Sequence, residues 1–415
     1  MRQPLNLTPG GVRTILEGTL DAAERQELSM AHPIVVVGGG IVGTAIACRL
    51  QARGAETVLV ERDSRPQGAS FFSFASLTAL DEPVPSLFAL KCAGMDAWRR
   101  WQQELSDDLG VSWDGEIRWA ETPQAAEQLQ AKIAEGARRG YAVRALDAQE
   151  LEQRLPNSRP TRVLAASYAP DDGQADPPRS IARMRQSFAD SGGTSLVGRA
   201  SLRFDEGEVH VRVGGDELLV SNVVVATGVE TTAFLEKLGW DIPVDAVPGM
   251  LVLTEPAETV IPGAVYVNAA TEPSIHLRQR GDGGVLIGEK SQEYAAGEAT
   301  SSHARVLLQQ AQQYFPGLAT AGISDFTVEA RPMPRDSRPI LGSLPGMTSV
   351  YVATGHSGIT LAPAIADLAA QELVDGEPAR QLDDFRPARF SRSLAGSTDD
   401  STAATFEVPA EIFLG

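Results

Sequence analysis

The apolar positions near the start of the chain predict a strand, a helix and a second strand. Residues 34–37 form a continuous apolar run, as expected of a parallel strand that is covered on both faces. A glycine-rich turn leads into residues 41–53, whose apolar positions suit a helix, and residues 57–60 form a second apolar strand. This order within about thirty residues is typical of a βαβ unit.

Later segments predict a different type of sheet. Short β-like segments recur at residues 250–254, 264–267, 274–278 and 284–287, which indicates an antiparallel sheet of the kind that covers a substrate. Other apolar runs predict strands at 221–225 and 349–353, and helical periodicity covers 125–139, 303–315 and 361–374. The predicted fold class is therefore α/β, with a Rossmann-type unit and a second, mainly antiparallel β-sheet plus helix domain.

Both ends of the chain have the character of appendages. Residues 1–32 precede the first strand and are interpreted as an N-terminal extension, in which residues 12–28 could form a short helix. Residues 391–415 are polar and rich in Ser and Thr, which predicts a disordered tail.

Charge and composition narrow the range of partners. The chain has 36 basic and 54 acidic residues and a formal net charge of −18, which argues against nucleic acid and anionic membranes as partners. No apolar run reaches the roughly 20 residues of a membrane helix, so no transmembrane segment is expected. The first 30 residues lack the layout of a signal peptide, and we expect a cytoplasmic protein. Two cysteines, Cys48 and Cys92, make a disulfide scaffold or a cysteine-rich metal site implausible.

The strongest local motif is Gly38-x-Gly40-x-x-Gly43, between the first strand and its helix. Gly38 permits the tight turn, Gly40 has no side chain to block a pyrophosphate, and Gly43 lets the helix pack closely on the sheet. The phosphates would then lie over the helix N-terminus at Ile41 and Val42, where free N–H groups favour negative charge. A dinucleotide site is predicted.

Glu61 ends the second strand, 18 residues beyond Gly43, where a carboxylate can accept hydrogen bonds from ribose hydroxyls. The same carboxylate would repel a 2′-phosphate, which disfavours NADP, whereas FAD and NAD fit equally well. There is no second glycine fingerprint and no Cys-x-x-Cys motif, which argues against the reductases that carry both FAD and NAD(P)H.

Four further motifs follow in order. They are Glu61-Arg62 with Gly68-Ala69-Ser70, then Ala226-Thr227-Gly228, then residues 331–342 (RPMPRDSRPILG), and finally residues 353–363 (ATGHSGITLAP). Together with the βαβ unit, this series resembles the D-amino-acid oxidase superfamily, which includes glycine oxidase, sarcosine oxidase and the D-amino-acid dehydrogenases. The resemblance covers nearly all of residues 33–390 and implies an FAD-dependent oxidoreductase.

The resemblance also implies how the chain divides and which residues hold the flavin. It implies a discontinuous FAD-binding domain at 33–87, 161–232 and 326–390, and a substrate domain at 88–160 and 233–325. Relatives with a cysteinyl-flavin link have a cysteine near the segment that corresponds to 331–342, and this chain has none, so non-covalent FAD is expected. The implied FAD contacts are Gly38, Gly40, Ile41, Val42, Gly43, Glu61, Arg62, Ala69, Ser70, Ala200, Ala226, Thr227, Gly228, Gly355, His356, Ser357, Gly358, Ile359 and Thr360.

Two residues are candidates for substrate chemistry. Arg331 matches the family position that clamps the substrate carboxylate, which suits the planar fork of a guanidinium; alternatively it pairs with Glu329 or a backbone carbonyl. His276 stands where several relatives place a tyrosine that touches substrate, although a lone histidine is more often a satisfied sheet residue. No Ser-His-Asp or metal-ligand cluster is visible, and the family chemistry needs neither.

The implied reaction is oxidation of a C–N bond in an amino acid or secondary amine, by hydride transfer from the substrate carbon to flavin N5, which gives an imine. Residues 284–288 lack the lysine that assists oxygen in the monomeric sarcosine oxidases, so either O2 or an electron carrier could be the acceptor. Two alternatives stay open: oxidation of a 2-hydroxy acid or other alcohol, and a partner-dependent flavoprotein subunit. The bulky, apolar residues 71–80 favour a larger or more hydrophobic substrate.

Overall fold

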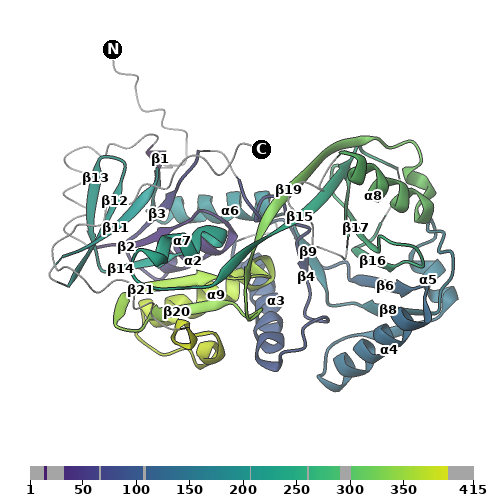
Figure 1. Ribbon diagram of the computed structural model, residues 1–415, viewed down its shortest axis with the longest axis horizontal. Coiled ribbons are helices and arrows are strands. Elements are labelled where there is room, and N and C mark those ends of the chain that lie inside the picture. Colours follow the sequence, from purple (N-terminus) through teal and green to yellow (C-terminus); the bar gives the residue numbers. More distant parts are fainter. Residues whose placement is uncertain are drawn as a thin grey trace, which may run out of the picture.

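Two β-sheets organise the molecule, one in each half of the view in Figure 1. The computed structural model describes residues 14–15, 32–64, 67–105, 109–205, 207–258, 261–289 and 301–390. The predicted disordered tail at 391–415 and most of the predicted extension at 1–32 lie outside this range. Within the range, Thr14–Ile15 forms a short strand, β1, where a helix was expected.

The first sheet has seven strands in the order β1-β10-β3-β2-β14-β21-β20, and only the pairing of β20 with β21 is antiparallel. Both faces of its centre are covered. Ile34 and Val36 of β2 point into one core cluster, and Val35 and Val37 point into another. This explains the continuous apolar run. The strands are β2 (Ile34–Val37), β3 (Thr57–Glu61), β10 (Thr194–Val197), β14 (Asn222–Val225), β20 (Ile340–Leu344) and β21 (Met347–Thr354).

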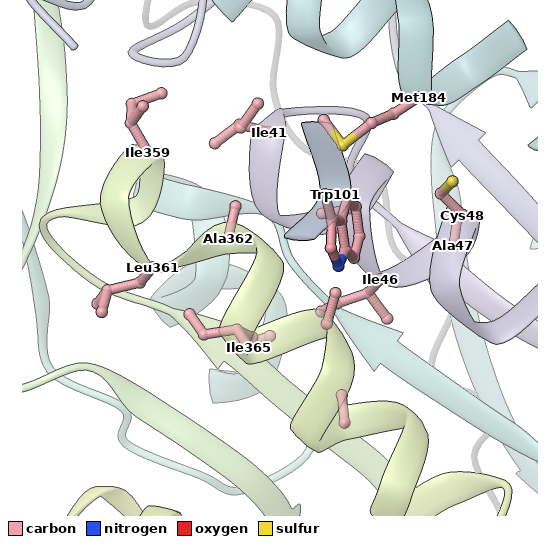
Figure 2. Close-up of a cluster of buried hydrophobic side chains, with 14 of the residues drawn as sticks. Ile41, Ile46, Ala47, Cys48, Trp101, Met184, Ile359, Leu361, Ala362 and Ile365 are labelled. Carbon is pink, nitrogen blue, oxygen red and sulfur yellow. The ribbon is translucent and has the colours of Figure 1, made fainter. Parts of the chain in front are cut away.

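Four helices meet in the core on one face of this sheet, namely α2 (Ile41–Ala52), α3 (Pro85–Leu105), α6 (Pro177–Asp190) and α9 (Gly358–Leu373). Figure 2 shows Ile46 of α2, Trp101 of α3 and Ile365 of α9 within this core. The helix α3 therefore packs with segments that were predicted to form the FAD-binding domain, although residues 88–160 were predicted to belong to the substrate domain. The amphipathic pattern of α3 identifies its buried face but not the partner that covers it.

The opposite face is covered by a small antiparallel sheet and a short helix. The small sheet consists of β11 (Ala200–Asp205), β12 (Glu208–Val213) and β13 (Asp216–Val220). It packs on the first sheet together with α7 (Thr231–Glu236), which follows the turn η2 (Gly228–Glu230). A further three-stranded sheet joins β4 (Ser76–Leu77), β9 (Gly173–Ala175) and β5 (Val111–Ser112).

The second large sheet has eight strands in the order β19-β15-β18-β17-β16-β6-β8-β7, and only β16 and β6 pair in parallel. This confirms the predicted fold class and the four predicted antiparallel segments. The strand β8 was assigned to the FAD-binding stretch 161–232, but it pairs with β6 and β7 in this sheet. The bounds are β6 (Glu116–Ala120), β7 (Arg144–Leu146), β8 (Ala165–Ala169), β15 (Val244–Thr254), β16 (Ala264–Asn268), β17 (Ile275–Gln279), β18 (Val285–Glu289) and β19 (Ile323–Pro334).

One face of the eight-stranded sheet packs on α8 (Ser301–Tyr314) in a third core cluster. The long strands β15 and β19 run from this half toward the first sheet and connect the two halves (Figure 1). The remaining helices are α4 (Pro123–Arg138), α5 (Ala148–Arg154), η3 (Pro316–Leu318), η4 (Arg380–Phe385) and η5 (Pro387–Arg389). Within the described part of the chain, no helix combines the length and apolar composition needed to cross a bilayer.

The first turn of α9 depends on a tryptophan of α3. Pro363 lies inside α9 and has no N–H to donate to the carbonyl of Ile359, four residues earlier. The Nε1–H of Trp98 donates to this carbonyl at 2.8 Å instead. Gly94 of α3 brings the helices close, because a Cβ at this position would lie 2.3 Å from the Thr360 oxygen.

We expect Trp98→Phe to destabilise the protein, because it removes the donor to the Ile359 carbonyl as well as buried volume. Pro363→Ala supplies a new N–H at the right position, so the same Trp98→Phe change should cost about 1 kcal/mol less in the Pro363→Ala background. Urea unfolding of the four proteins measures this coupling. An equal cost in both backgrounds would mean that Trp98 contributes through packing alone.

Candidate active site

A cavity of about 1020 Å³ lies between the two large sheets. One wall is formed by the turns after β2, β3 and β14 and by the start of α9; the other wall includes β15 to β19 and β6. Every position that the sequence predicted to contact FAD lines this cavity except Gly43. The structure therefore brings together residues that are far apart in the chain.

The three fingerprint glycines have distinct surroundings. A Cβ on Gly38, whose φ is +111°, would lie 2.4 Å from the Ala226 oxygen, so the turn passes directly beside the end of β14. A Cβ on Gly43 would lie 1.9 Å from the Gly38 oxygen, so this glycine allows close packing beneath the site instead of lining it. Gly40 lies on the wall, and a Cβ there would lie 3.0 Å from the Ser70 hydroxyl oxygen.

The N-cap residue of α2 has no side chain that could cap the helix. Gly40 occupies the N-cap position, and the Ile41 N–H donates to the Ser70 hydroxyl at 3.1 Å. Ser70 therefore lies where a phosphate would meet the helix N-terminus. The positive end of the helix dipole and its N–H groups favour an anion at this place.

Glu61 is held beside this turn by backbone donors. Its Oε2 accepts from the Gly39 N–H at 2.7 Å, and its Oε1 accepts from the Arg62 N–H at 2.8 Å. Arg185 of α6 donates to the Gly39 oxygen at 2.9 Å and lies 3.9 Å from the Glu61 carboxylate. Arg62 itself pairs with Asp63 and with Glu230 of η2, which ties the turns after β3 and β14 together.

The N-terminus of α9 reaches the same cavity. The helix begins at Gly358, earlier than predicted, and its N-cap Ser357 has a left-handed conformation with φ of 60° and no side-chain cap. Gly355 has φ of +152°, and a Cβ there would lie 2.7 Å from Pro339 Cα. A Cβ on Gly358 would lie 3.2 Å from Val42 of α2, so two uncapped helix N-termini stand side by side.

These features fit a flavin dinucleotide. The uncapped end of α2 can hold a diphosphate, Glu61 can accept from ribose hydroxyls, and the end of α9 can face the part of the flavin that gains negative charge on reduction. No group of three or more potential metal ligands occurs in the described residues, so within them nothing indicates a metal centre.

The opposite wall is one face of the eight-stranded sheet. Residues such as Ile117, Val265 and Leu277 point to the core with α8. Because side chains alternate along a strand, their neighbours point to the cavity. Cross-strand pairing aligns Arg118 of β6, Tyr266 of β16, His276 of β17 and Gly288 of β18 in one row on this face.

His276 is buried among aromatic rings. Its ring stacks on Tyr266 with centroids 5.3 Å apart and meets Phe74 edge-on at 4.3 Å. Gly288 leaves room for it, since a Cβ there would lie 2.4 Å from His276 Nε2. Burial, with help from the charges of Arg331 and Arg118, lowers the pKa of His276 to about 3. The imidazole is therefore neutral near pH 7 and is a weak base.

His356 precedes α9 and faces the cavity, and its Nδ1 lies 3.1 Å from the Ser357 hydroxyl. Burial among protein atoms, together with the charges of Lys91 and Arg331, lowers its pKa to about 4. Both histidines on the wall are therefore uncharged at neutral pH.

Arg331 lies on β19 and lines the cavity. Its Nη2 donates to the Pro248 oxygen at 2.8 Å and its Nε to the Val247 oxygen at 3.3 Å, both on β15. The sequence left open whether Arg331 pairs with Glu329 or with a backbone carbonyl, and the structure shows hydrogen bonds to backbone carbonyls. These bonds orient the guanidinium, which still lines the cavity.

The sequence missed Arg118 and Tyr266. Arg118 is buried, pairs with Glu116 at 2.5 Å and Asp81 at 2.6 Å, and lies over the Tyr266 ring at 4.6 Å. The alternation in 116–120 indicates that Arg118 faces away from Trp119, but only the pairing of β6 with β16 places it at the cavity. Arg278, which could have been a surface charge, is buried and donates to the Phe74 oxygen at 2.6 Å.

Comparison with known proteins gives consistent matches. The family model described as "FAD dependent oxidoreductase" matches residues 33–372. The chain is 24% identical to a subunit of the opine oxidase of Rhizobium meliloti, over 87% of this chain and 98% of that protein. It is 25% identical to glycine oxidase of Pseudomonas aeruginosa, over 86% of this chain and 99% of that protein. The solved L-amino acid deaminase of Proteus vulgaris, with its specific insertion sequence deleted, is similar with a TM-score of 0.79 at 22% identity, over 92% and 99% of the two chains.

The lowered pKa of His276 predicts a pH effect on stability. In the unfolded chain a histidine has a pKa near 6.5. Below this pH the unfolded state binds a proton that the folded state does not bind, so the free energy of unfolding decreases. His276→Gln removes this contribution, so the loss of unfolding free energy between pH 6.5 and 5 should be about 2 kcal/mol smaller than in the wild type. Urea unfolding at both pH values measures the difference. Equal losses in the two proteins would contradict a neutral, buried imidazole.

Proposed function

The chain belongs to the family of FAD-dependent oxidoreductases, and on this basis we propose that it oxidises the C–N bond of an amino acid or a secondary amine to an imine. The observation that carries this proposal is the cavity itself. Two uncapped helix N-termini stand at one wall, and an arginine held by backbone carbonyls stands at the other. This arrangement suits an anionic redox cofactor facing a substrate carboxylate.

In this proposal the FAD diphosphate lies over α2 beside Ser70, the ribose hydroxyls bond to Glu61, and the flavin reaches the residues around His356. When bound, FAD supplies an acceptor for the hydride of the substrate carbon. The binding is proposed to be non-covalent, because neither Cys48 of α2 nor Cys92 of α3 lies on the cavity wall. The FAD-binding segments would correspond to the first sheet and its helices, and the substrate domain to the eight-stranded sheet.

Arg331 is proposed to bind the substrate carboxylate. Its planar fork can make two parallel charge-assisted hydrogen bonds, and burial, which lowers its pKa, also strengthens such bonds by excluding water. The rings of Phe74, Tyr266 and His276 form a neutral surface beside it, which fits the apolar part of a substrate. The chain contributes orientation and a dry pocket.

A second candidate is a subunit that needs a partner for turnover. The similarity to the opine oxidase protein supports it, since that relative is named as one subunit of an oxidase. The electron acceptor, O2 or a carrier, would then depend on the assembly. Turnover by the purified single chain would exclude this candidate.

The proposed function predicts a yellow protein whose flavin is bleached by amines. Purified protein mixed without oxygen with a panel of amino acids, secondary amines and 2-hydroxy acids should lose its visible flavin absorbance with a member of the first two classes only. Acid precipitation should release the flavin into the supernatant, since no covalent link is expected. Bleaching only by hydroxy acids, or a colourless protein that takes up no added FAD, would contradict the proposal.

Arg331→Ala should raise KM for the carboxylate substrate steeply and leave FAD bound. Losing a charge-assisted pair to a buried carboxylate costs about 2–5 kcal/mol. The matched control is Arg335→Ala. Arg335 follows the end of β19, is exposed, pairs with Asp245 of β15 and does not line the cavity. Steady-state kinetics and flavin content of both variants provide the measurement. An unchanged KM in Arg331→Ala would show that this arginine does not bind substrate.

A further inference from the structure

A second charged residue of β19 faces the cavity beside Arg331. Glu329 precedes Arg331 by two positions, is half-buried, and lines the cavity. Across the residues that the structure describes, its carboxylate has no hydrogen-bond or ion-pair partner. A carboxylate that is partly removed from water without a partner is unfavourable, and a ligand or a catalytic role would explain why it is kept there.

Strand pairing places Glu329 on the same face as the other wall residues. In the antiparallel pair of β15 and β19, Glu329 lies opposite Gly249, and Arg331 lies opposite Val247. Leu251, two residues beyond Gly249, lies opposite Gly288, which belongs to the row with His276. Because the side-chain period of a strand is two, all these positions share the cavity face.

Gly249 brings the two charges near each other. A Cβ at this position would lie 2.8 Å from Arg331 Nε and 3.0 Å from its Cζ, so the guanidinium extends over Gly249, directly across from Glu329. The two side chains nevertheless form no ion pair with each other. A guanidinium and a carboxyl group thus occupy neighbouring positions on the wall without pairing with each other.

Among the titratable groups of β17, β18 and the start of α9 that line the cavity, none is an unpartnered carboxylate like Glu329. His276 on β17 and His356 before α9 are neutral near pH 7 because burial lowers the pKa of each. The Glu289 carboxylate on β18 pairs with His303 of α8, with Oε2 and Nε2 3.2 Å apart. Burial alone raises the pKa of Glu329, so its carboxylate holds a proton more readily than an exposed one.

We propose that Glu329 receives the ammonium group of the substrate while Arg331 holds its carboxylate, and that Glu329 takes up the ammonium proton before oxidation. This inference rests on the proposed function. The step is balanced: one N–H bond of the ammonium breaks, an O–H bond forms on the Glu329 carboxylate, and the nitrogen keeps the electron pair. The neutral amine can then lose hydride from its carbon, whereas an ammonium has no lone pair to assist this.

The first test measures binding and not turnover. The dithionite-reduced holoenzyme cannot oxidise substrate, so calorimetry can compare the best amino acid of the panel with the carboxylic acid of the same skeleton without its amino group. In Glu329→Gln the Kd of the amino acid should rise about 10- to 100-fold, the usual weight of a hydrogen bond to a charged group. The Kd of the deaminated acid should stay within about twofold, since its Arg331 contact is retained.

The second test is a pH profile of kcat/KM. With Glu329 present the zwitterion binds and is deprotonated in the site, so the profile is flat through neutral pH. In Glu329→Gln only the free amine reacts, so kcat/KM should rise about tenfold per pH unit up to the pKa of the substrate amine. The matched control is Asp325→Asn, which should retain the flat profile. Asp325 lies on the same strand but is exposed and does not line the cavity.

A wild-type profile in Glu329→Gln, or equal weakening of the amino acid and the deaminated acid, would overturn the inference. If Glu329→Gln does not retain FAD, Glu329→Asp is used in its place. Withdrawing the carboxylate by one methylene should raise the Kd of the amino acid and leave the Kd of the deaminated acid unchanged. An unchanged Kd of the amino acid overturns the inference. Failure of the proposed function is distinct. In that case no amine or amino acid bleaches the wild-type flavin, whatever residue stands at position 329.

Discussion

The packing of α2 against α9 is the constraint on which the rest of the structure depends. It sets two uncapped helix N-termini side by side, with Gly358 of α9 against Val42 of α2. Two positive helix ends repel each other, and nothing in their own first turns neutralises them. The buried core around Ile46, Trp101 and Ile365 holds the helices together against this repulsion, and an anionic cofactor between them would remove it (Figure 2).

The opposite wall shows how one sheet can serve two purposes. One face of the eight-stranded sheet is a core with α8, and the other presents polar and aromatic groups to the cavity. Burial then decides the charge of each group. It makes His276 neutral, while Arg331 keeps its charge and is oriented by carbonyls of β15. The wall therefore presents neutral rings next to Arg118, together with an arginine and a carboxyl group on β19 that do not pair with each other.

The two halves of the molecule share more elements than the predicted domain boundaries indicate. The strands β15 and β19 run from the eight-stranded sheet toward the first sheet, so Arg331 belongs to one sheet and faces the ligand site of the other (Figure 1). Similarly, α3 packs with α2 and α9, and β8 pairs with β6. The cavity at this junction is therefore lined by elements of both sheets.

Resemblance to a known family implied almost every residue on the cavity wall at α2 and α9. The sequence itself determined the βαβ unit, the roles of Gly38 and Gly43 and the antiparallel segments. These follow from local rules, since a buried parallel strand must be apolar and a tight turn beside a helix N-terminus requires glycine. Only the tertiary structure placed Arg118, Tyr266 and Glu329 at the cavity and made His276 neutral. The reason is that strand pairing between distant segments decides which face each side chain shares, and burial by those partners decides its charge.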